Sequence, residues 1–365
     1  MTRPVVAVVV AARDEAKHLP ACLRSIRSQR GVDFECVIVD DGSVDATTAI
    51  AERLTHRDDR FRLIRHDEPR GLAGARNSGL QQASASLITF LDGDDFLFPG
   101  SLRVRVERLT RGEDDVIGCY GDWLSVPEWF PRFPVLKRAA TRPDVWMASA
   151  DRAVPFIASA PVLRRDLVAR IGGFDESVRT AEDAEFWQWW LRLRGRTVYQ
   201  PTLCVAYRRR AGSMTRRDLA GHFRANQHAF SSFDRAMPGS PGGVLPATDS
   251  TYRFSSAAVS RAGLAAAVAF AENRIGEARE VLAELDPVVV RLTPPEAAAA
   301  TATALAIRRT RGTAGGRRLV ARIRASADGF SRLVEERAAP RANAEELREA
   351  AEWLGAQRGF SSELR

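Results

Sequence analysis

Acidic residues follow three short apolar segments near the start of this 365-residue chain. They are Asp14 and Glu15, Asp40 and Asp41, and Asp92, Asp94 and Asp95. Like charges placed close together repel, so such a group normally holds a cation or accepts hydrogen bonds from a ligand rich in N–H and O–H groups. Gly93 lets the backbone approach closely, and the spacing puts the Asp92 and Asp94 carboxylates on one side of an extended turn. Carboxylates in this arrangement suit Mg²⁺ or Mn²⁺, which would bridge two phosphate groups.

The segments that must position these acids alternate between strand-like and helix-like periodicity. Apolar runs predict strands, and residues at helical spacing predict helices between them. The expected strands are 5–10, 34–39, 61–64 and 87–91, and the expected helices lie near 19–26, 46–54 and 73–83. Such alternation predicts a mostly parallel, doubly wound α/β sheet, whose ligands bind at the C-terminal ends of the strands.

The second half of the chain has a different pattern. After Gly121 the sequence is irregular and rich in Pro and Trp, which suits a partly extended segment lining a cleft, and helical periodicity returns over 182–194. Turn-forming residues are frequent in 237–250, and the rest contains alanine-rich amphipathic segments. We therefore expect a domain at 1–236, a Pro/Gly-rich linker at 237–250 and an all-α helical domain at 251–365.

Composition restricts the class of protein. The net charge is +8, and Lys17 and Lys137 are the only lysines, so arginines supply most of the positive charge. This balance favours an anionic partner or a solvated helix surface. The four cysteines are far apart without a CxxC spacing, which indicates neither a zinc site nor a disulfide framework. Because the apolar runs are shorter than the about 20 residues of a membrane span, we expect a cytoplasmic protein with at most peripheral membrane contact.

Two large classes of nucleotide-binding enzyme are excluded by missing loops. The first predicted strand ends in Ala11-Ala12-Arg13-Asp14-Glu15, where a dinucleotide-binding domain would carry GxGxxG. The pattern GxxxxGK[ST] of the P-loop NTPases is also absent from the sequence. Neither an NAD enzyme nor a P-loop NTPase is therefore expected.

Residues 4 to about 215 resemble family 2 glycosyltransferases with the GT-A fold. The matching stretches, in order, are 5–15 (VVAVVVAARDE), 37–45 (VIVDDGSVD), 71–79 (GLAGARNSG), 88–95 (ITFLDGDD), 172–175 (GGFD) and 180–187 (TAEDAEFW). The resemblance implies an inverting transferase that takes a sugar, of the hexosyl type, from a nucleotide-linked donor. Residues beyond about 250 lie outside it.

The resemblance also implies a donor site. Its members would be Ala11, Arg13, Glu15, Asp40, Asp41, Arg76, Asp92, Gly93, Asp94 and Arg210. Ala11 and Arg13 would shape the base pocket, while Asp40 would bond the uracil imide and Asp41 would support that turn. Arg76 would contact the nucleotide. Asp92 would face the ribose or the donor sugar, and Asp94 and Asp92 would hold the divalent cation.

Asp183 resembles the general base of the family. It opens a predicted helix that carries tryptophans, and the neighbouring Glu182 with partial burial would raise its pKa towards the working pH. The alternative is that Glu182 and Asp183 only complement the dipole of that helix. The indole faces of Trp123, Trp129 and Trp146 suit a sugar or aglycone, or else belong to the core.

The sequence departs from the family pattern at Arg210. Many relatives carry a histidine there that completes the metal site, whereas a guanidinium cannot ligate a cation. Either Asp94, the diphosphate and water hold the metal alone, or Arg210 pairs with the leaving diphosphate. A Mn²⁺ or Mg²⁺ cofactor is expected in both cases.

The expected reaction joins a nucleotide-linked sugar, most simply a UDP-sugar, to an acceptor hydroxyl. The acceptor could be a glycan, a lipid-linked molecule, a peptide or a natural product, and no nucleic acid partner is expected. A homodimer through the C-terminal helices is a further expectation. Two alternatives stay open, namely a vestigial scaffold whose helical domain binds a protein, and a sugar-phosphate nucleotidyltransferase, although the lysine-bearing glycine-rich loop that the latter needs is absent.

Overall fold

A computed structural model describes residues 4–56, 58–127, 135–137, 156–191, 193 and 195–210. The strands are β1 (Val6–Ala12), β2 (Phe34–Asp40), β3 (Phe61–Arg65), β4 (Leu87–Asp92), β5 (Phe96–Leu97), β6 (Val116–Pro127), β7 (Val135–Lys137), β8 (Val162–Arg164) and β9 (Arg196–Arg209). The helices are α1 (Leu19–Arg27), α2 (Thr47–Thr55), α3 (Gly71–Gln82), α4 (Ser101–Leu109), α5 (Arg165–Arg170) and α6 (Glu182–Leu191). The four strands and three helices expected over the first 91 residues are confirmed.

All nine strands form one sheet in the order β3-β2-β1-β4-β8-β6-β9-β5, with β7 paired to β6. The pairings among β1, β2, β3 and β4 are parallel. By contrast, β8 is antiparallel to β4 and β6, β7 to β6, and β5 to β9. The pairing of β6 with β9 is parallel again. The expected mostly parallel sheet is therefore corrected to a mixed one, because β5, β7 and β8 each run opposite to the strands they pair with.

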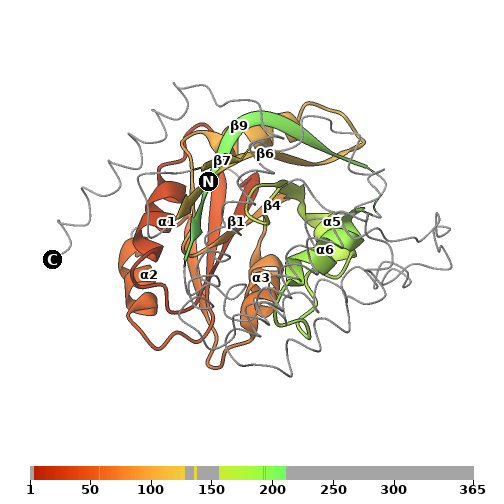
Figure 1. Cartoon of the computed structure of the whole chain (residues 1–365). Coiled ribbons are helices and arrows are strands. Elements are labelled where there is room, and N and C mark those ends of the chain that lie inside the picture. The colour runs from red at the N-terminus through yellow and green to blue at the C-terminus, as the bar shows by residue number, and fades with distance from the viewer. Residues whose placement is uncertain are drawn as a thin grey trace, which may run out of the picture. The chain divides into compact units, whose positions relative to one another are not determined.

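Helices cover both faces of this sheet (Figure 1). On one face, Val6, Val8 and Val10 of β1 pack in a cluster with apolar residues of α1, α2 and α4. On the other, Ala7 and Val9 pack in a cluster with residues of α3, α5 and α6. Every residue of β1 is buried, as a central strand covered on both sides requires. The predicted α/β class is confirmed, with helices packed on both faces of the sheet.

Close packing places α3 directly against the sheet. A Cβ atom at Gly79 would lie 2.2 Å from Cγ1 of Val9, so only glycine permits this approach. The close contact between Gly79 and Val9 fixes the side chains of α3 relative to β1.

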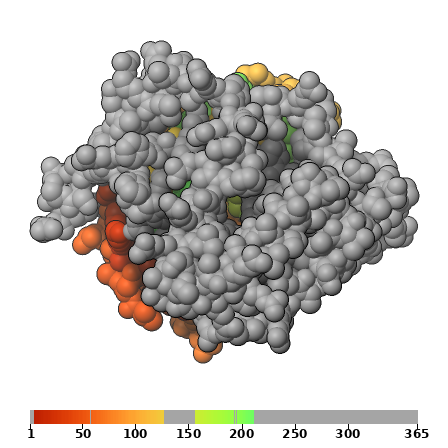
Figure 2. Space-filling model, viewed as in Figure 1, coloured from red at the N-terminus to blue at the C-terminus, as the bar shows by residue number. Residues whose placement is uncertain are grey.

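In the view of Figure 2, the red and orange surface at the lower left belongs to the N-terminal segment with α1 and α2.

Several expectations concern residues beyond the described ranges. The linker at 237–250, the helical domain at 251–365 and a dimer through its helices stay predictions. The extended segment expected after Gly121 corresponds to β6, and the helix expected from residue 182 is α6. No helix within the described ranges is long and apolar enough to span a membrane.

Candidate active site

The C-terminal ends of β2, β1 and β4 meet at one edge of the sheet, as expected from parallel strands. Ala12 is paired with Asp40, and Ala11 with Asp92. Gly93 donates its N–H to the Ala11 carbonyl at 2.9 Å, and a Cβ at Gly93 would lie 3.0 Å from the Cβ of Ala12. The turn after β4 is therefore pressed against the end of β1, which positions the acidic side chains on either side of Gly93.

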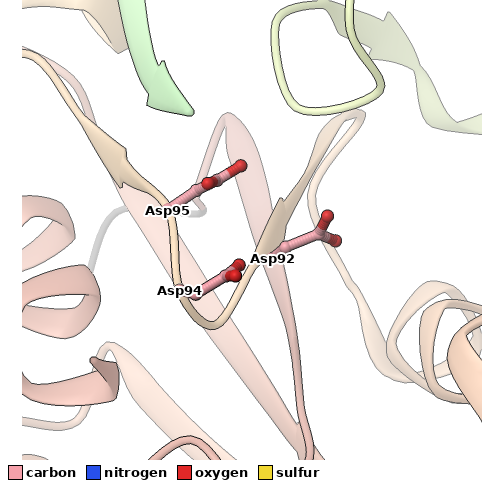
Figure 3. Close-up of side chains that lie close together, drawn as sticks. All are labelled: Asp92, Asp94 and Asp95. Atoms are coloured by element: carbon pink, nitrogen blue, oxygen red, sulfur yellow. The ribbon is translucent and has the colours of Figure 1, made fainter. Parts of the chain in front are cut away.

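Three carboxylates converge at this turn. Oxygen atoms of Asp92, Asp94 and Asp95 all lie within 4.8 Å of one another. Figure 3 shows the three side chains leaving the segment that joins β4 to β5. Hard oxygen ligands at this spacing fit a Mg²⁺ or Mn²⁺ ion. The structure thus brings together Asp92 and Asp94 as expected and adds Asp95, whose only signal in the sequence was its place in a run of three acids among four residues.

The cluster carries more negative charge than its surroundings compensate. Burial, with the nearby Asp92 carboxylate, raises the pKa of Asp94 to about 7, although Arg210 opposes the shift. Burial, followed by repulsion from Asp94 and Asp92, also raises the pKa of Asp95 well above its ordinary value. Both shifts are those expected of a site that gains from a bound cation.

Arg210 lies in ion-pairing distance of this cluster. Its Nε is 2.7 Å from Oδ2 of Asp94, and its Nη2 is 2.7 Å from Oε1 of Glu15. Glu15 also contacts Nδ1 of His18 at 3.0 Å through its second oxygen. The guanidinium therefore provides positive charge beside Asp94, at the position where the sequence departs from the family pattern.

The end of β9 holds Asp95 in place. The Arg208 N–H donates to Oδ1 of Asp95 at 2.8 Å, and the Ser159 hydroxyl lies 3.3 Å from its Oδ2. The Nε of Arg208 donates to the Asp94 carbonyl at 3.1 Å. Two arginines of the run 208–210 therefore contact the acidic turn directly.

The two aspartates after β2 have different roles in the structure. Oδ1 of Asp40 accepts the Ser43 N–H at 3.0 Å, and Oδ2 accepts the Thr48 hydroxyl. Asp41 accepts the N–H groups of Arg70 and Gly71, each at 2.8 Å, and so caps the start of α3. The expected role of Asp41 in supporting the base-binding turn stays a prediction.

A partly buried histidine, His66, reinforces that cap. The His66 ring bonds Asp41 through Nδ1 at 2.7 Å and the Ser78 hydroxyl through Nε2 at 2.9 Å. Ser78 belongs to α3, so His66 links the end of β2 to the body of that helix. The sequence motifs gave no signal for this contact, because His66 lies between two of the recognised stretches.

The loop after β1 carries the residues expected around the base. Ala11 and Ala12 are buried, whereas the Arg13 side chain is 53% exposed. Asp14 has a positive φ of 54°, and its Oδ1 accepts the Val44 N–H at 2.9 Å while its own N–H donates to the Ser43 hydroxyl. The loops after β1 and β2 are thus held together, with Arg13 accessible to a ligand.

A short strained turn precedes the helix that carries the expected base. Ala181 has a φ of 58°, which is uncommon for a residue with a Cβ and occurs mainly where the surrounding structure enforces it. Glu182 and Asp183 then form the first turn of α6, where negative charge complements the helix dipole. Glu182 is buried, and Asp183 is partly exposed.

Arg76 connects α6 to the acidic turn. Its Nη1 donates to Glu182 at 2.7 Å and its Nη2 to Asp92 at 2.8 Å. Burial alone would lower the pKa of Arg76, but the carboxylates of Asp92, Glu182 and Asp183 raise it above its ordinary value. Burial raises the pKa of Glu182 to about 7 against the opposing effect of Arg76. The expected contact of Arg76 with the nucleotide stays a prediction, because this side chain is only 2% exposed.

Aromatic packing fixes α6 in the core. Phe186 stacks on Phe174 with ring centroids 4.5 Å apart and on Trp190 at 6.2 Å. Asn77 of α3 bonds both the N–H and the carbonyl of Phe174, at 2.9 and 2.8 Å. Residues 75–77, 172–175 and 182–187, which the sequence marked as separate motifs, therefore form one connected unit.

The tryptophans expected near a sugar are only partly described. Trp123 of β6 is partly buried and packs against both apolar clusters of the sheet, which favours the core alternative. Trp129 and Trp146 lie outside the described residues.

Comparisons with known proteins identify relatives over the same segment. The profile described as Glycosyl transferase family 2 matches residues 7–137. The "Uncharacterized protein MT1568" of Mycobacterium tuberculosis is 30% identical over 241 residues, or 60% of this chain and 71% of that protein. The succinoglycan biosynthesis protein ExoO of Rhizobium meliloti is 32% identical over 223 residues, or 58% of this chain and 63% of ExoO.

A solved structure also aligns with much of the chain. The mannosyltransferase PcManGT of Pyrobaculum calidifontis, in complex with GDP-Man and Mn²⁺, matches 83% of this chain and 85% of its own, with 20% identity and a TM-score of 0.47. Among curated relatives, the chain spans between 34% and 63% of the length of three, ExoO included.

Proposed function

Because the chain belongs to glycosyl transferase family 2, a family of enzymes, we propose that it is an inverting transferase that moves a sugar from a nucleotide-linked donor to an acceptor hydroxyl. One observation carries the proposal. Three convergent carboxylates lie at the edge of the sheet, and a buried arginine ties them to the helix that begins with Glu182 and Asp183. A scaffold without activity would have no use for an acidic turn in which burial, with repulsion between neighbouring carboxylates, raises the pKa values of Asp94 and Asp95.

The donor would bind along the loops after β1, β2 and β4. Ala11, Arg13 and Asp40 would receive the base, and we take a UDP-sugar as the most direct donor. Asp92, Asp94 and Asp95 would hold a divalent cation, which when bound supplies positive charge to the leaving diphosphate. Arg210, already 2.7 Å from Asp94, would move its guanidinium onto the same phosphates.

Asp183 would act as the general base. Its carboxylate would accept the proton of the acceptor hydroxyl while that oxygen attacks the anomeric carbon from the face opposite the diphosphate. The bond to the diphosphate breaks as the new glycosidic bond forms, which inverts the anomeric configuration. The aromatic packing of α6 and its tie to Arg76 would keep Asp183 from moving.

Only the chemical class of the acceptor is proposed. The relative ExoO is named for succinoglycan biosynthesis, which favours a growing glycan over a peptide or a natural product. A glycan carried on a lipid would also bring the enzyme to a membrane surface, where the excess of arginine would be attracted to anionic headgroups. The expected cytoplasmic location and peripheral contact are proposed on this ground.

Replacement of Asp183 by Asn tests the assignment. We expect the variant to bind UDP within a few-fold of the parent, while turnover falls by roughly 10²- to 10⁴-fold, because general-base loss leaves the donor contacts intact. UDP release from UDP-sugars with Mn²⁺ measures turnover, and calorimetric titration measures UDP binding. Asp166→Asn, an exposed acid in the first turn of α5, is the matched control.

Three results would contradict the proposal. Near-parental turnover of Asp183→Asn would remove the base assignment. Pyrophosphate release from UTP and a sugar phosphate would instead indicate a nucleotidyltransferase. Absence of both UDP binding and turnover across a panel of nucleotide sugars would favour the scaffold.

A further inference from the structure

Arg76 stands between the two halves of the candidate site. One arm of its guanidinium donates to Asp92 at the end of β4, and the other donates to Glu182 at the start of α6, at 2.8 and 2.7 Å. Asp92 and Glu182 are 90 positions apart in the sequence, so Arg76 joins two distant parts of the chain, in addition to the packing of Phe90 of β4 on Phe186 of α6. The planar fork of arginine fits two such acceptors at a fixed angle.

The side chain of Arg76 is held by a rigid frame. Its Cζ lies 5.2 Å from the centre of the Phe174 ring, and only 2% of the residue is exposed. The helix that carries it is capped by Asp41 and packed on Val9 through Gly79. A buried guanidinium whose two amino groups both donate hydrogen bonds can hold two elements at a fixed spacing. The same burial leaves it poorly placed to contact a ligand.

We propose that Arg76 is a positioning residue that fixes the start of α6, and with it Asp183, relative to the carboxylates after β4. The inference rests on the proposed function, because it assigns Arg76 to the alignment of the base and the donor site instead of to the nucleotide contact. The strained backbone at Ala181 belongs to the same device, since the Arg76–Glu182 pair is a contact that opposes relaxation of that turn.

Lysine cannot replace this arginine. An ammonium group is a compact point charge and would sit on one carboxylate, so that either the buried Glu182 loses its arginine partner or the tie to Asp92 is broken. We therefore expect Arg76→Lys to lower kcat at least tenfold, since misplacement of a catalytic group by about 1 Å can cost about 10²-fold. The dissociation constant for UDP with Mn²⁺ should stay within about threefold of the parent, because the base pocket is untouched.

Two further variants keep the test decisive if Arg76→Lys does not fold. Glu182→Ala removes the acceptor on α6 but leaves the contact with Asp92, and should show the same loss of kcat with UDP binding retained. Glu182→Gln keeps an oxygen at the same reach and should retain most of the activity that the alanine variant loses. Rescue by Gln separates a positioning role from a role of the Glu182 charge.

Hydrogen exchange supplies a readout that does not depend on turnover. Amides of 182–187 should exchange at least tenfold faster in Arg76→Lys, while those of β1 and β4 should not change. Arg105→Lys is the matched control, because Arg105 is equally buried but donates to the carbonyls of Ser101 and Ala160 and not to a carboxylate of the site. If the parent protein transfers no sugar, the proposed function fails while this measurement still decides whether Arg76 holds α6.

Unchanged kcat and unchanged exchange in Arg76→Lys would overturn the inference. An equal loss of activity in Arg105→Lys would also overturn it, since the effect would then be general destabilisation. A rise of more than tenfold in the UDP dissociation constant with kcat preserved would return Arg76 to the nucleotide contact implied by the family resemblance.

Discussion

Arg210 offers a sharp test of how the acidic turn handles a cation. Its guanidinium forms ion pairs with Glu15 and Asp94, so an incoming Mn²⁺ must displace a positive charge from one of its own ligands. Arg210→Gln removes that competitor and leaves the three carboxylates in place. We expect the nucleotide-free variant to bind Mn²⁺ more tightly than the parent.

The structure gives the size of the effect. Exposed ion pairs contribute about 0.2–1 kcal/mol each, and partial burial strengthens them. Because the Arg210 side chain is 30% exposed, solvent screens its two ion pairs only in part, and we take about 1–2 kcal/mol for the two together. Since about 1.4 kcal/mol corresponds to a tenfold change in affinity, Mn²⁺ should bind about tenfold more tightly.

Calorimetric titration of Mn²⁺ at pH 8 measures this difference. That pH lies above the pKa of about 7 of Asp94 in the parent. The loss of Arg210 raises this pKa and so favours competing protons, which makes the gain observed at pH 8 a lower limit. Arg62→Gln is the control, because this half-exposed arginine pairs with Glu35 and its loss changes the net charge equally. Unchanged or weaker Mn²⁺ binding in Arg210→Gln, or an equal gain in Arg62→Gln, would refute the reasoning.

Two other predictions follow from the acidic turn. The pKa of Asp94 is raised to about 7 in the folded protein, so its contribution to stability is present at low pH and is lost as the pH rises through about 7. The metal-free protein should therefore melt at a lower temperature at pH 8 than at pH 6. The rise in Tm caused by Mn²⁺ should be larger at pH 8. An equal rise in Tm at both pH values would contradict this prediction. Gly93→Ala places a Cβ 3.0 Å from the Cβ of Ala12, so we expect the free energy of unfolding to fall by roughly 1–3 kcal/mol and Mn²⁺ to bind more weakly. Denaturant unfolding measures the first effect and calorimetric titration the second. Parental values of both would show that the turn accommodates the extra methyl group.

The first half of the fold could be predicted because local patterns and tertiary burial agree there. The run 5–12 is apolar at every position, and a strand buried on both faces requires this. The short strands β5, β7 and β8 have only two or three residues each, too few to show a period. The antiparallel partners of β5 and β8 are also far away in the sequence. The sheet was therefore expected to be more parallel than it is.

The sequence could predict where in the fold the site residues lie, but it could not predict which side chains they contact. Acids at strand ends must gather at one edge of a parallel sheet, so Asp40 and Asp92 could be placed near each other from spacing alone. The choice of partner depends on which side chains are desolvated together, and this is a property of the packed core. Arg76 illustrates the difference, since its motif suggested a ligand contact while burial makes an unpaired guanidinium too costly and directs it to Asp92 and Glu182. The same argument explains Arg210, because a cation beside a turn with too much negative charge takes the nearest carboxylates until a ligand of greater charge replaces it.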